Sequence, residues 1–247
     1  MIKLKIIEAY WEKRNLGITC AEIEIGKNDP FQETIDTTLA RKEQYIVAKV
    51  IHGRTDILFE LQKGGFLFIE TLFETEMSLK GKPIIPAIYS SLVQKVGYHV
   101  ATATEQSKVI EEVRNRHIFS TDRVALDPHF SKELAGQRYA FWIEDIMVRE
   151  GSRMIITEYE GNNIGFNVFS TKGKICEGLL GGLFIDYLDS GLGFANSYAS
   201  LLAGHDLWGT KIVSHVSSNN FQMFKLHLFC GMNIRNLIYV LVRHNNC

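Results

Sequence analysis

Two neighbouring segments decide the fold: SGLGFANSYASLL at Ser190–Leu202 and VSSNNFQMFKLHLFCGM at Val216–Met232. In both, glycine or polar residues suited to a helix start precede apolar residues with helical spacing. We expect the first helix to end at Gly204, and the second to begin at a cap near Asn220 and end at Gly231. Each segment follows a short apolar run, so the sequence predicts two consecutive strand–helix units.

The first segment opens with Gly191 and Gly193, which allow a tight turn. Backbone N–H groups at such a turn and at a helix N-terminus can bind a phosphate group. On their own, the two glycines favour a helix start without a ligand, because such starts are common. The predicted apolar face of this helix holds Phe194, Ala195, Tyr198, Leu201 and Leu202.

The apolar run Leu179–Phe184 before this turn contains the pair Gly181-Gly182. Glycines in a strand can splay it from its neighbour, and the exposed N–H groups can then bind a carbonyl oxygen. They can equally mark a buried strand that is thin because another element packs closely against it. The sequence leaves both interpretations open.

The second segment predicts a helix with Phe221, Phe224 and Leu228 as its buried stripe. Asn220 and His227 lie seven residues apart on a different shared face, which can point into a gap between strands. Without further context, His227 is better interpreted as a surface histidine that has no role.

The rest of the chain predicts an N-terminal α/β domain at residues 1–97 and a second domain at 98–247, with a boundary marked by the proline-containing stretch at 81–86. No internal repeat is visible. The predicted strands are 2–7, 20–25, 45–50, 66–79, 154–159, 164–170, 175–183, 211–216 and 234–244, and the predicted helices include 31–42, 56–62, 107–115 and one capped by Ser131.

Composition excludes several classes of protein. Lys and Arg total 27 against 28 for Asp and Glu, so the net charge gives no reason to expect a nucleic-acid partner. The four cysteines are scattered, which predicts reduced thiols, no metal site and a cytoplasmic protein. No apolar stretch is long enough for a signal peptide or a membrane span, so we expect no membrane partner.

The order of strand, GxG loop, helix, strand, Asn-capped helix, glycine and strand resembles GNAT-superfamily acetyltransferases. Their loop pattern [Gln/Arg]-x-x-Gly-x-[Gly/Ala] is matched at Gly191 and Gly193, with Leu188 at the basic or amide position. Their helix pattern "N-x-x-A-x-x-x-Y-x-x-x-G-F" is matched at Asn220 and Gly231. His227 stands where the family has the tyrosine that protonates the departing CoA thiolate, and Met232 follows the glycine.

The N-terminal half narrows the resemblance. WEKRNLG at Trp11–Gly17 is similar to the opening of dTDP-fucosamine (TDP-4-amino-4,6-dideoxygalactose) acetyltransferases. The segment Phe119–Ile146 is similar to a second stretch of that family. The matches in this segment are Asp122, Arg123, Asp127, Phe130, Tyr139 and Trp142.

The resemblance implies a mixed, largely antiparallel sheet flanked by helices, and an acetyl-CoA-dependent N-acetyltransferase of surface-polysaccharide biosynthesis. Its acceptor would be the primary amine of a nucleotide-linked amino sugar. Alternatives are another small amine, such as an amino acid or a protein N-terminus, or a non-catalytic acyl-CoA-binding module. A homodimer is compatible with the resemblance.

The implied site has His227 as the acid, because an imidazole near its reference pKa of about 6.5 can carry a proton at neutral pH. Backbone groups at Leu183–Phe184 would stabilise the oxyanion. The base is left open among Glu158, Glu177, His215 and a bound water. The implied cofactor-binding residues are Leu183, Phe184, Ile185, Ser190, Gly191, Leu192, Gly193, Phe194 and Asn220.

Overall fold

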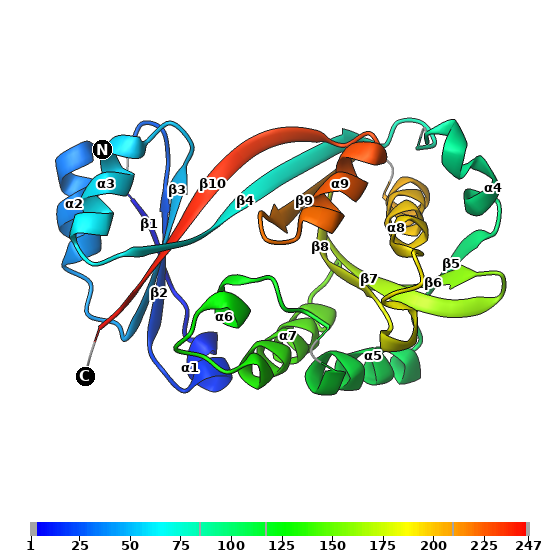
Figure 1. The fold of residues 1–247 in the computed structure, drawn as a ribbon, viewed down its shortest axis with the longest axis horizontal. Helices are drawn as coiled ribbons and strands as arrows, with labels where there is room; N and C mark the ends of the chain where they lie inside the picture. The colour runs from blue at the N-terminus through cyan, green and yellow to red at the C-terminus, as the bar shows by residue number, and fades with distance from the viewer. Residues whose placement is uncertain (1–3, 84, 117, 209, 246–247) are drawn as a thin grey trace.

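The computed structural model describes residues 4–83, 85–116, 118–208 and 210–245, and Figure 1 shows its course. Its strands are β1 (Lys5–Glu8), β2 (Cys20–Ile25), β3 (Tyr45–Ile51), β4 (Leu67–Ser78), β5 (Val96–Val100), β6 (Arg153–Tyr159), β7 (Asn162–Lys172), β8 (Ile175–Leu183), β9 (Lys211–Ser217) and β10 (Asn233–His244). Its α-helices are α1 (Trp11–Leu16), α2 (Phe31–Leu39), α3 (Thr55–Lys63), α4 (Ser90–Val93), α5 (Ala103–Arg116), α6 (Arg123–Leu126), α7 (Lys132–Met147), α8 (Gly193–Leu207) and α9 (Phe221–Phe229), with 3₁₀ turns η1 (Ala87–Tyr89) and η2 (Ile185–Tyr187).

The described strands form one ten-stranded sheet in the order β1-β2-β3-β10-β4-β9-β8-β7-β6-β5. The pairs β2–β3 and β8–β9 are parallel, and the other neighbours are antiparallel. The predicted fold class, a mixed and largely antiparallel sheet flanked by helices, is confirmed.

Alternation along the strands gives the sheet two apolar faces. In the first part, Ile23 and Ile46 pack with α2 and α3 on one face, whereas Cys20 and Tyr45 pack towards α1, α6 and α7 on the other. In the second part, α8 covers one face around Cys176, and α5 and α7 cover the opposite face. The row α1, α6, α7 and α5 runs along the lower side of Figure 1, under the long strands β4 and β10.

The strands β4 and β10 join the two parts of the molecule. β10, from the C-terminal part of the chain, lies between β3 and β4 of the N-terminal part. β4, in turn, lies between β10 and β9, so each part contributes one strand that is flanked by a strand of the other part. The division at residue 97 stays a prediction. It falls inside β5, and the sheet continues across both sides of it.

Two local predictions have clear outcomes. The Ser131 cap of α7 is confirmed, because the Ser131 hydroxyl accepts a hydrogen bond from the Leu134 N–H. The end of α8 at Gly204 is wrong: the helix continues to Leu207, and Gly204 is buried inside it. A Cβ at Gly204 would lie 3.1 Å from Leu79 Cδ1, so this glycine serves close packing rather than termination. Among the described residues, no helix is long and apolar enough to cross a membrane.

Candidate functional site

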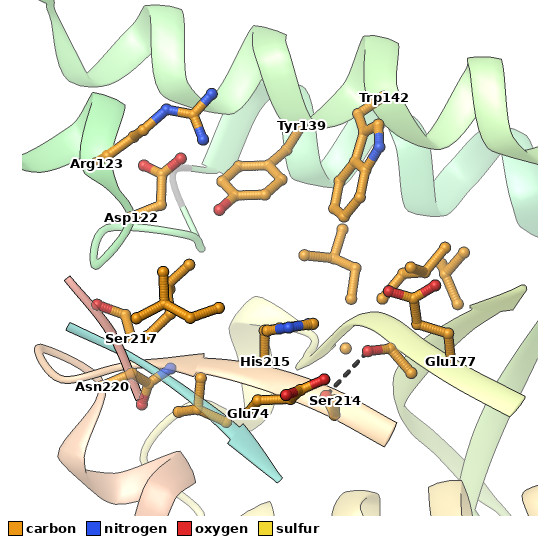
Figure 2. Close-up of a pocket in the computed structure, with 18 of the residues that line it drawn as sticks. Glu74, Asp122, Arg123, Tyr139, Trp142, Glu177, Ser214, His215, Ser217 and Asn220 are labelled. Carbon is orange, nitrogen blue, oxygen red and sulfur yellow. Dashed lines mark hydrogen bonds between the residues drawn. The ribbon is translucent and has the colours of Figure 1, made fainter. Parts of the chain in front are cut away.

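The site begins where two parallel strands separate. β8 and β9 pair only from Ile175 opposite Lys211 to Gly178 opposite Ser214, although both strands continue beyond this point. The last connection is a 2.9 Å hydrogen bond from the Ser214 hydroxyl to the Gly178 carbonyl oxygen, drawn as a dashed line in Figure 2. Past it, the edges of the two strands are unpaired with each other and form a V-shaped opening.

A cavity of about 1540 Å³ includes this opening. It is larger than the roughly 300–1,000 Å³ of most small-molecule pockets, so it has room for two substrates. In Figure 2, α6 and α7 form its roof and the sheet forms its floor. The labelled roof residues are Asp122, Arg123, Tyr139 and Trp142, and the labelled floor residues are Glu74, Glu177, Ser214, His215, Ser217 and Asn220.

The structure shows close packing at the Gly181-Gly182 pair, and the binding of a carbonyl oxygen by backbone N–H groups of this strand stays a prediction. A Cβ at Gly181 would lie 2.3 Å from the Asn167 side-chain oxygen, so β8 is thin because β7 packs closely against it. Asn167 is held in a buried polar cluster by its amide, which donates to Asn196 Oδ1 at 3.0 Å. The Thr157 hydroxyl donates to the same oxygen at 2.6 Å. The cluster holds β8 against β7, whereas the opposite edge of β8 is not paired with β9 beyond Gly178.

Two of the predicted backbone donors are already occupied. The Phe184 N–H donates to the Ile164 carbonyl oxygen at 3.0 Å, and the Ile185 N–H donates to the Glu112 carboxylate at 2.7 Å. Neither is free for an oxyanion. Because N–H directions alternate along a strand, the N–H groups of Leu183 and Gly181 point away from β7, and of these two residues Gly181 lines the cavity. Of the expected pair, Leu183 therefore keeps its role as a proposal.

The loop before α8 has the expected glycine turn. Gly191 has φ +76°, which favours glycine, and nothing lies within 4 Å of a Cβ placed there. The first N–H groups of the 15-residue helix α8 are free of intrahelical partners. The Phe194 side chain is not available to a ligand, because it is buried and stacks on Tyr89 with ring centroids 3.8 Å apart.

The charge of this loop differs from that of a usual phosphate site. No Lys or Arg occurs between Lys174 and Lys211, and the exposed loop carries Asp186 and Asp189. The loop itself would therefore offer a ligand phosphate backbone groups alone. Among the described residues that line the cavity, Asn220 is the one member of the predicted cofactor set, so the structure does not bring the loop residues into this cavity.

His227 lines the cavity from α9, and its environment opposes a positive charge. Its Nδ1 lies 2.9 Å from the hydroxyl of Thr75, which is fully buried and lies 3.2 Å from the Ser214 carbonyl oxygen. Burial lowers the pKa of His227 to about 4. The imidazole is therefore neutral at pH 7, and the premise that it carries a proton there as an imidazolium is wrong.

The predicted buried stripe of α9 is also wrong. Phe221 and Leu228 have exposed fractions of 60% and 43%. Phe224 is half-buried and stacks on Phe73 with ring centroids 4.2 Å apart. The helix lies at the rim of the cavity and is not enclosed between layers, which explains why an apolar pattern does not become buried. The Asn220 cap is confirmed by a 3.1 Å hydrogen bond from the Met223 N–H.

The candidates for the general base differ in whether they line the cavity. Glu158 lies on β6, where its carboxylate is 2.6 Å from His99 Nδ1, and it is not among the described cavity residues. Glu177 and His215 both line the cavity floor. Glu74 lines it too, but it accepts hydrogen bonds from Asn236 and Arg235.

A buried network of charges, which the sequence patterns did not predict, joins the roof to the first part of the sheet. Glu12 accepts hydrogen bonds from Arg138 at 2.8 Å, and Arg123 pairs with Glu22, which also accepts from Lys49 at 2.6 Å. The available signal was Glu22, a charged residue inside the apolar run CAEIEI.

Glu70 on β4 lines the same end of the cavity. Its exposed fraction is 4%, its Oε2 has no hydrogen-bond partner among the described residues, and burial raises its pKa. The cavity therefore ends at a carboxyl group that a ligand could satisfy.

Comparisons with known proteins agree on the fold. No family model and no curated protein matches the sequence. A GCN5-related N-acetyltransferase from Sphaerobacter thermophilus matches with TM-score 0.63 and 10% identity, over 98% of this chain and 76% of that one. A tandem GNAT protein from the clavulanic acid biosynthesis pathway matches with TM-score 0.55 and 10% identity, over 93% and 78%. A GCN5-related N-acetyltransferase from Kribbella flavida matches with TM-score 0.53 and 13% identity, over 92% and 82%. The chain therefore has the GNAT fold.

Proposed function

We propose that the protein is an acetyl-CoA-dependent N-acetyltransferase. The observation that carries this proposal is the separation of β8 from β9 after Gly178, with a cavity that includes the opening and is large enough for two substrates. An extended pantetheine arm can pair with the free edge of β8 as an added strand. The N-terminus of α8 would hold the pyrophosphate through backbone N–H groups.

The reaction requires an amine to lose a proton, attack the thioester carbonyl carbon and expel the CoA thiolate. The Leu183 N–H would stabilise the oxyanion formed by this attack. Glu177 or His215 would accept the amine proton, because both line the floor beside the opening. Neither role depends on a metal ion.

For His227 we propose the tautomer in which the Thr75 hydroxyl donates to Nδ1, at 2.9 Å, in place of its 3.2 Å hydrogen bond to the Ser214 carbonyl oxygen, so that the imidazole proton is on Nε2. A neutral imidazole cannot protonate a thiolate as an imidazolium would, but its N–H can donate a hydrogen bond to it. His227 would therefore stabilise the leaving thiolate in the transition state without changing its own charge.

The proposed acceptor is a nucleotide-linked amino sugar of surface-polysaccharide biosynthesis. Four residues that carry the resemblance, Asp122, Arg123, Tyr139 and Trp142, line the roof opposite the opening. Aromatic rings can stack on a base or a sugar, and Arg123, whose charge is paired with Glu22, still has an Nε–H without a hydrogen-bond partner among the described residues. Another small amine is the alternative acceptor. A cytoplasmic location and a homodimer stay predictions.

The test has two stages. Calorimetric titration with acetyl-CoA measures binding, and release of free thiol is then followed with TDP- and UDP-linked amino sugars, amino acids and peptide N-termini. We expect binding, and turnover with the nucleotide-linked amino sugars. Absence of acetyl-CoA binding would contradict the whole proposal, and turnover with amino acids alone would contradict the acceptor.

Two substitutions test His227 within this assay. His227→Ala should lower turnover by about 100-fold while the acetyl-CoA Kd changes little, because the hydrogen bond acts in the transition state. His227→Tyr introduces another neutral donor and should retain most of the turnover. If both variants turn over like the wild type, His227 has no part in the reaction.

A second candidate function, a non-catalytic acyl-CoA-binding module, is favoured by a specific observation. His227, at the position of the expected acid, is not protonated as an imidazolium at pH 7, because burial lowers its pKa to about 4. Binding of acetyl-CoA without thiol release for any amine tested would support this function.

A further inference from the structure

Three potential metal-ligating side chains meet away from the cavity described above. Asp127 and His129 lie in the connection between α6 and α7, and His244 ends β10. Their ligand atoms all lie within 4.8 Å of one another. The Asp127 carboxylate is 3.0 Å from His129 Nδ1 through one oxygen and 2.8 Å from His244 Nε2 through the other.

The cluster is held in place by backbone and ring contacts. The His129 N–H donates to the Asp127 carboxylate at 3.0 Å, and the Phe130 N–H donates to the Asp127 carbonyl oxygen at 3.0 Å. The rings of His129 and His244 stack with centroids 3.9 Å apart. Tyr45, which is fully buried, lies against the other side of His244 with ring centroids 4.8 Å apart. The side chains are therefore arranged before any ion binds.

The spacing suits a small divalent cation. Ligand atoms at about 2.1 Å from a tetrahedral zinc ion are about 3.4 Å apart, so the two Asp–His pairs, at 3.0 and 2.8 Å through different carboxylate oxygens, would have to open and the side chains to turn towards a shared ion. Two imidazoles and a carboxylate form a common ligand set for zinc and related transition metals. The buried Asp127 lies at the inner side, and the half-exposed His129 leaves the fourth position accessible to water.

We propose that Asp127, His129 and His244 bind a divalent transition-metal ion, with zinc as the best fit. The ion would connect the α6–α7 segment, which carries the cavity roof, to the end of β10. Its role would be structural, because none of the three ligands is among the described residues that line the cavity. This inference does not depend on the proposed acetyltransferase activity.

The experiment uses the full chain after removal of metals with a chelator. Co²⁺ is added first, because bound Co²⁺ gives visible absorption bands that report its coordination geometry, and Zn²⁺ is then titrated by calorimetry. We expect absorption typical of nitrogen and oxygen ligands, displacement of Co²⁺ by Zn²⁺, and a higher Tm with Zn²⁺. Absence of both the Co²⁺ bands and the Zn²⁺ heat would overturn the proposal.

Variants identify the ligands. His129→Ala should weaken Zn²⁺ binding by at least about 100-fold, because loss of even an outer-shell partner costs about 10- to 100-fold. This side chain is more than half exposed, so the variant should fold. His244→Ala should act in the same way. The matched control is His205→Ala, which removes another histidine beside a carboxylate, 2.7 Å from Asp206, and should leave binding unchanged. Wild-type affinity in His129→Ala would mean that the ion binds elsewhere.

Discussion

The two parts of the molecule contain the same unit of three strands and two helices, β2–α2–β3–α3–β4 in the first part and β8–α8–β9–α9–β10 in the second. Only in the second unit do the two parallel strands separate. In the first unit, the parallel strands β2 and β3 pair along six positions, from Cys20 opposite Tyr45 to Ile25 opposite Val50. In the second, β8 and β9 stop pairing at Gly178 and Ser214, and the cavity passes through the gap. The same order of elements therefore creates a site only where the parallel pair is broken.

The equivalence of the units extends to their lengths. β3, α3 and β4 have 7, 9 and 12 residues, and β9, α9 and β10 have the same lengths. The connections 52–54 and 218–220 also match, as do 64–66 and 230–232. Gly65 and Gly231 have φ of 86° and 85° at the same point after the helix.

Equivalent positions show how one unit closes and the other opens. Leu61 of α3 is fully buried in the apolar core, whereas its counterpart His227 in α9 lines the cavity. Arg54 at the start of α3 donates to three carbonyl oxygens of the β2–α2 connection. Its counterpart Asn220 caps its own helix and lines the cavity. Apolar filling and a bridging cation close the first unit, whereas neutral polar side chains occupy the two equivalent positions of the second.

The largest effect should come from adding a single methyl group to β7 where it packs against β8 of the second unit. A Cβ at Gly165 would lie 2.5 Å from the Gly182 carbonyl oxygen and 3.0 Å from Asn196 Oδ1. Gly165→Ala should therefore lower the free energy of unfolding by about 3 kcal/mol, measured by chemical denaturation. The control is Gly26→Ala in the first unit, where the nearest atom would be 3.6 Å away and little change is expected. Equal effects of the two substitutions would remove the packing argument for β8.

The next effect concerns His227 and pH. Because its folded pKa is lowered from 6.5 to about 4, the native state resists protonation, and stability present above pH 6.5 is lost as pH falls towards 4. This loss amounts to about 3 kcal/mol. His227→Leu introduces the residue found at the equivalent position Leu61 of the first unit, and leucine does not titrate. Between pH 7 and pH 4 the unfolding free energy of the variant should therefore fall by about 3 kcal/mol less than that of the wild type. Parallel curves of stability against pH would show that His227 titrates normally.

The sequence predicts most of the elements because alternation and helical spacing follow from burial. The repeat of the two units is not visible in the sequence, because burial requires only that a residue is apolar and not which apolar residue it is. Ile46 and Val47 recur at the equivalent positions Ile212 and Val213, but few other residues do. The cavity floor could be inferred in part from Gly181 and Asn220. The pKa of His227 could not, because it depends on the burial of its side chain in the folded protein.

A smaller effect is expected from opening the first unit. The Arg54 Nη1 donates to the carbonyl oxygens of Gly26, Lys27 and Asp29 at 3.2, 3.3 and 2.8 Å. Arg54→Ala leaves these acceptors without their charged donor and should cost about 2 kcal/mol of unfolding free energy. Arg54→Lys should recover part of this loss, because its ammonium keeps the charge and can bond the carbonyls but lacks the planar fork that also bonds the Asp56 carboxylate. A change below about 0.5 kcal/mol in Arg54→Ala would show that pairing of β2 with β3 needs no such bridge.

The smallest effect is at the counterpart of Arg54. Asn220 accepts from the Met223 N–H at 3.1 Å, so Asn220→Ala should lower the free energy of unfolding by about 1 kcal/mol through loss of the α9 cap. Asn220→Ser, which keeps a capping oxygen, should restore this stability. If Asn220 also contacts the cofactor, both variants should bind acetyl-CoA more weakly than the wild type, even though only the alanine variant is less stable. Normal acetyl-CoA affinity in both variants would show that Asn220 acts only as the cap of α9. Its contribution to the opening of the second unit would then be limited to fixing the start of that helix.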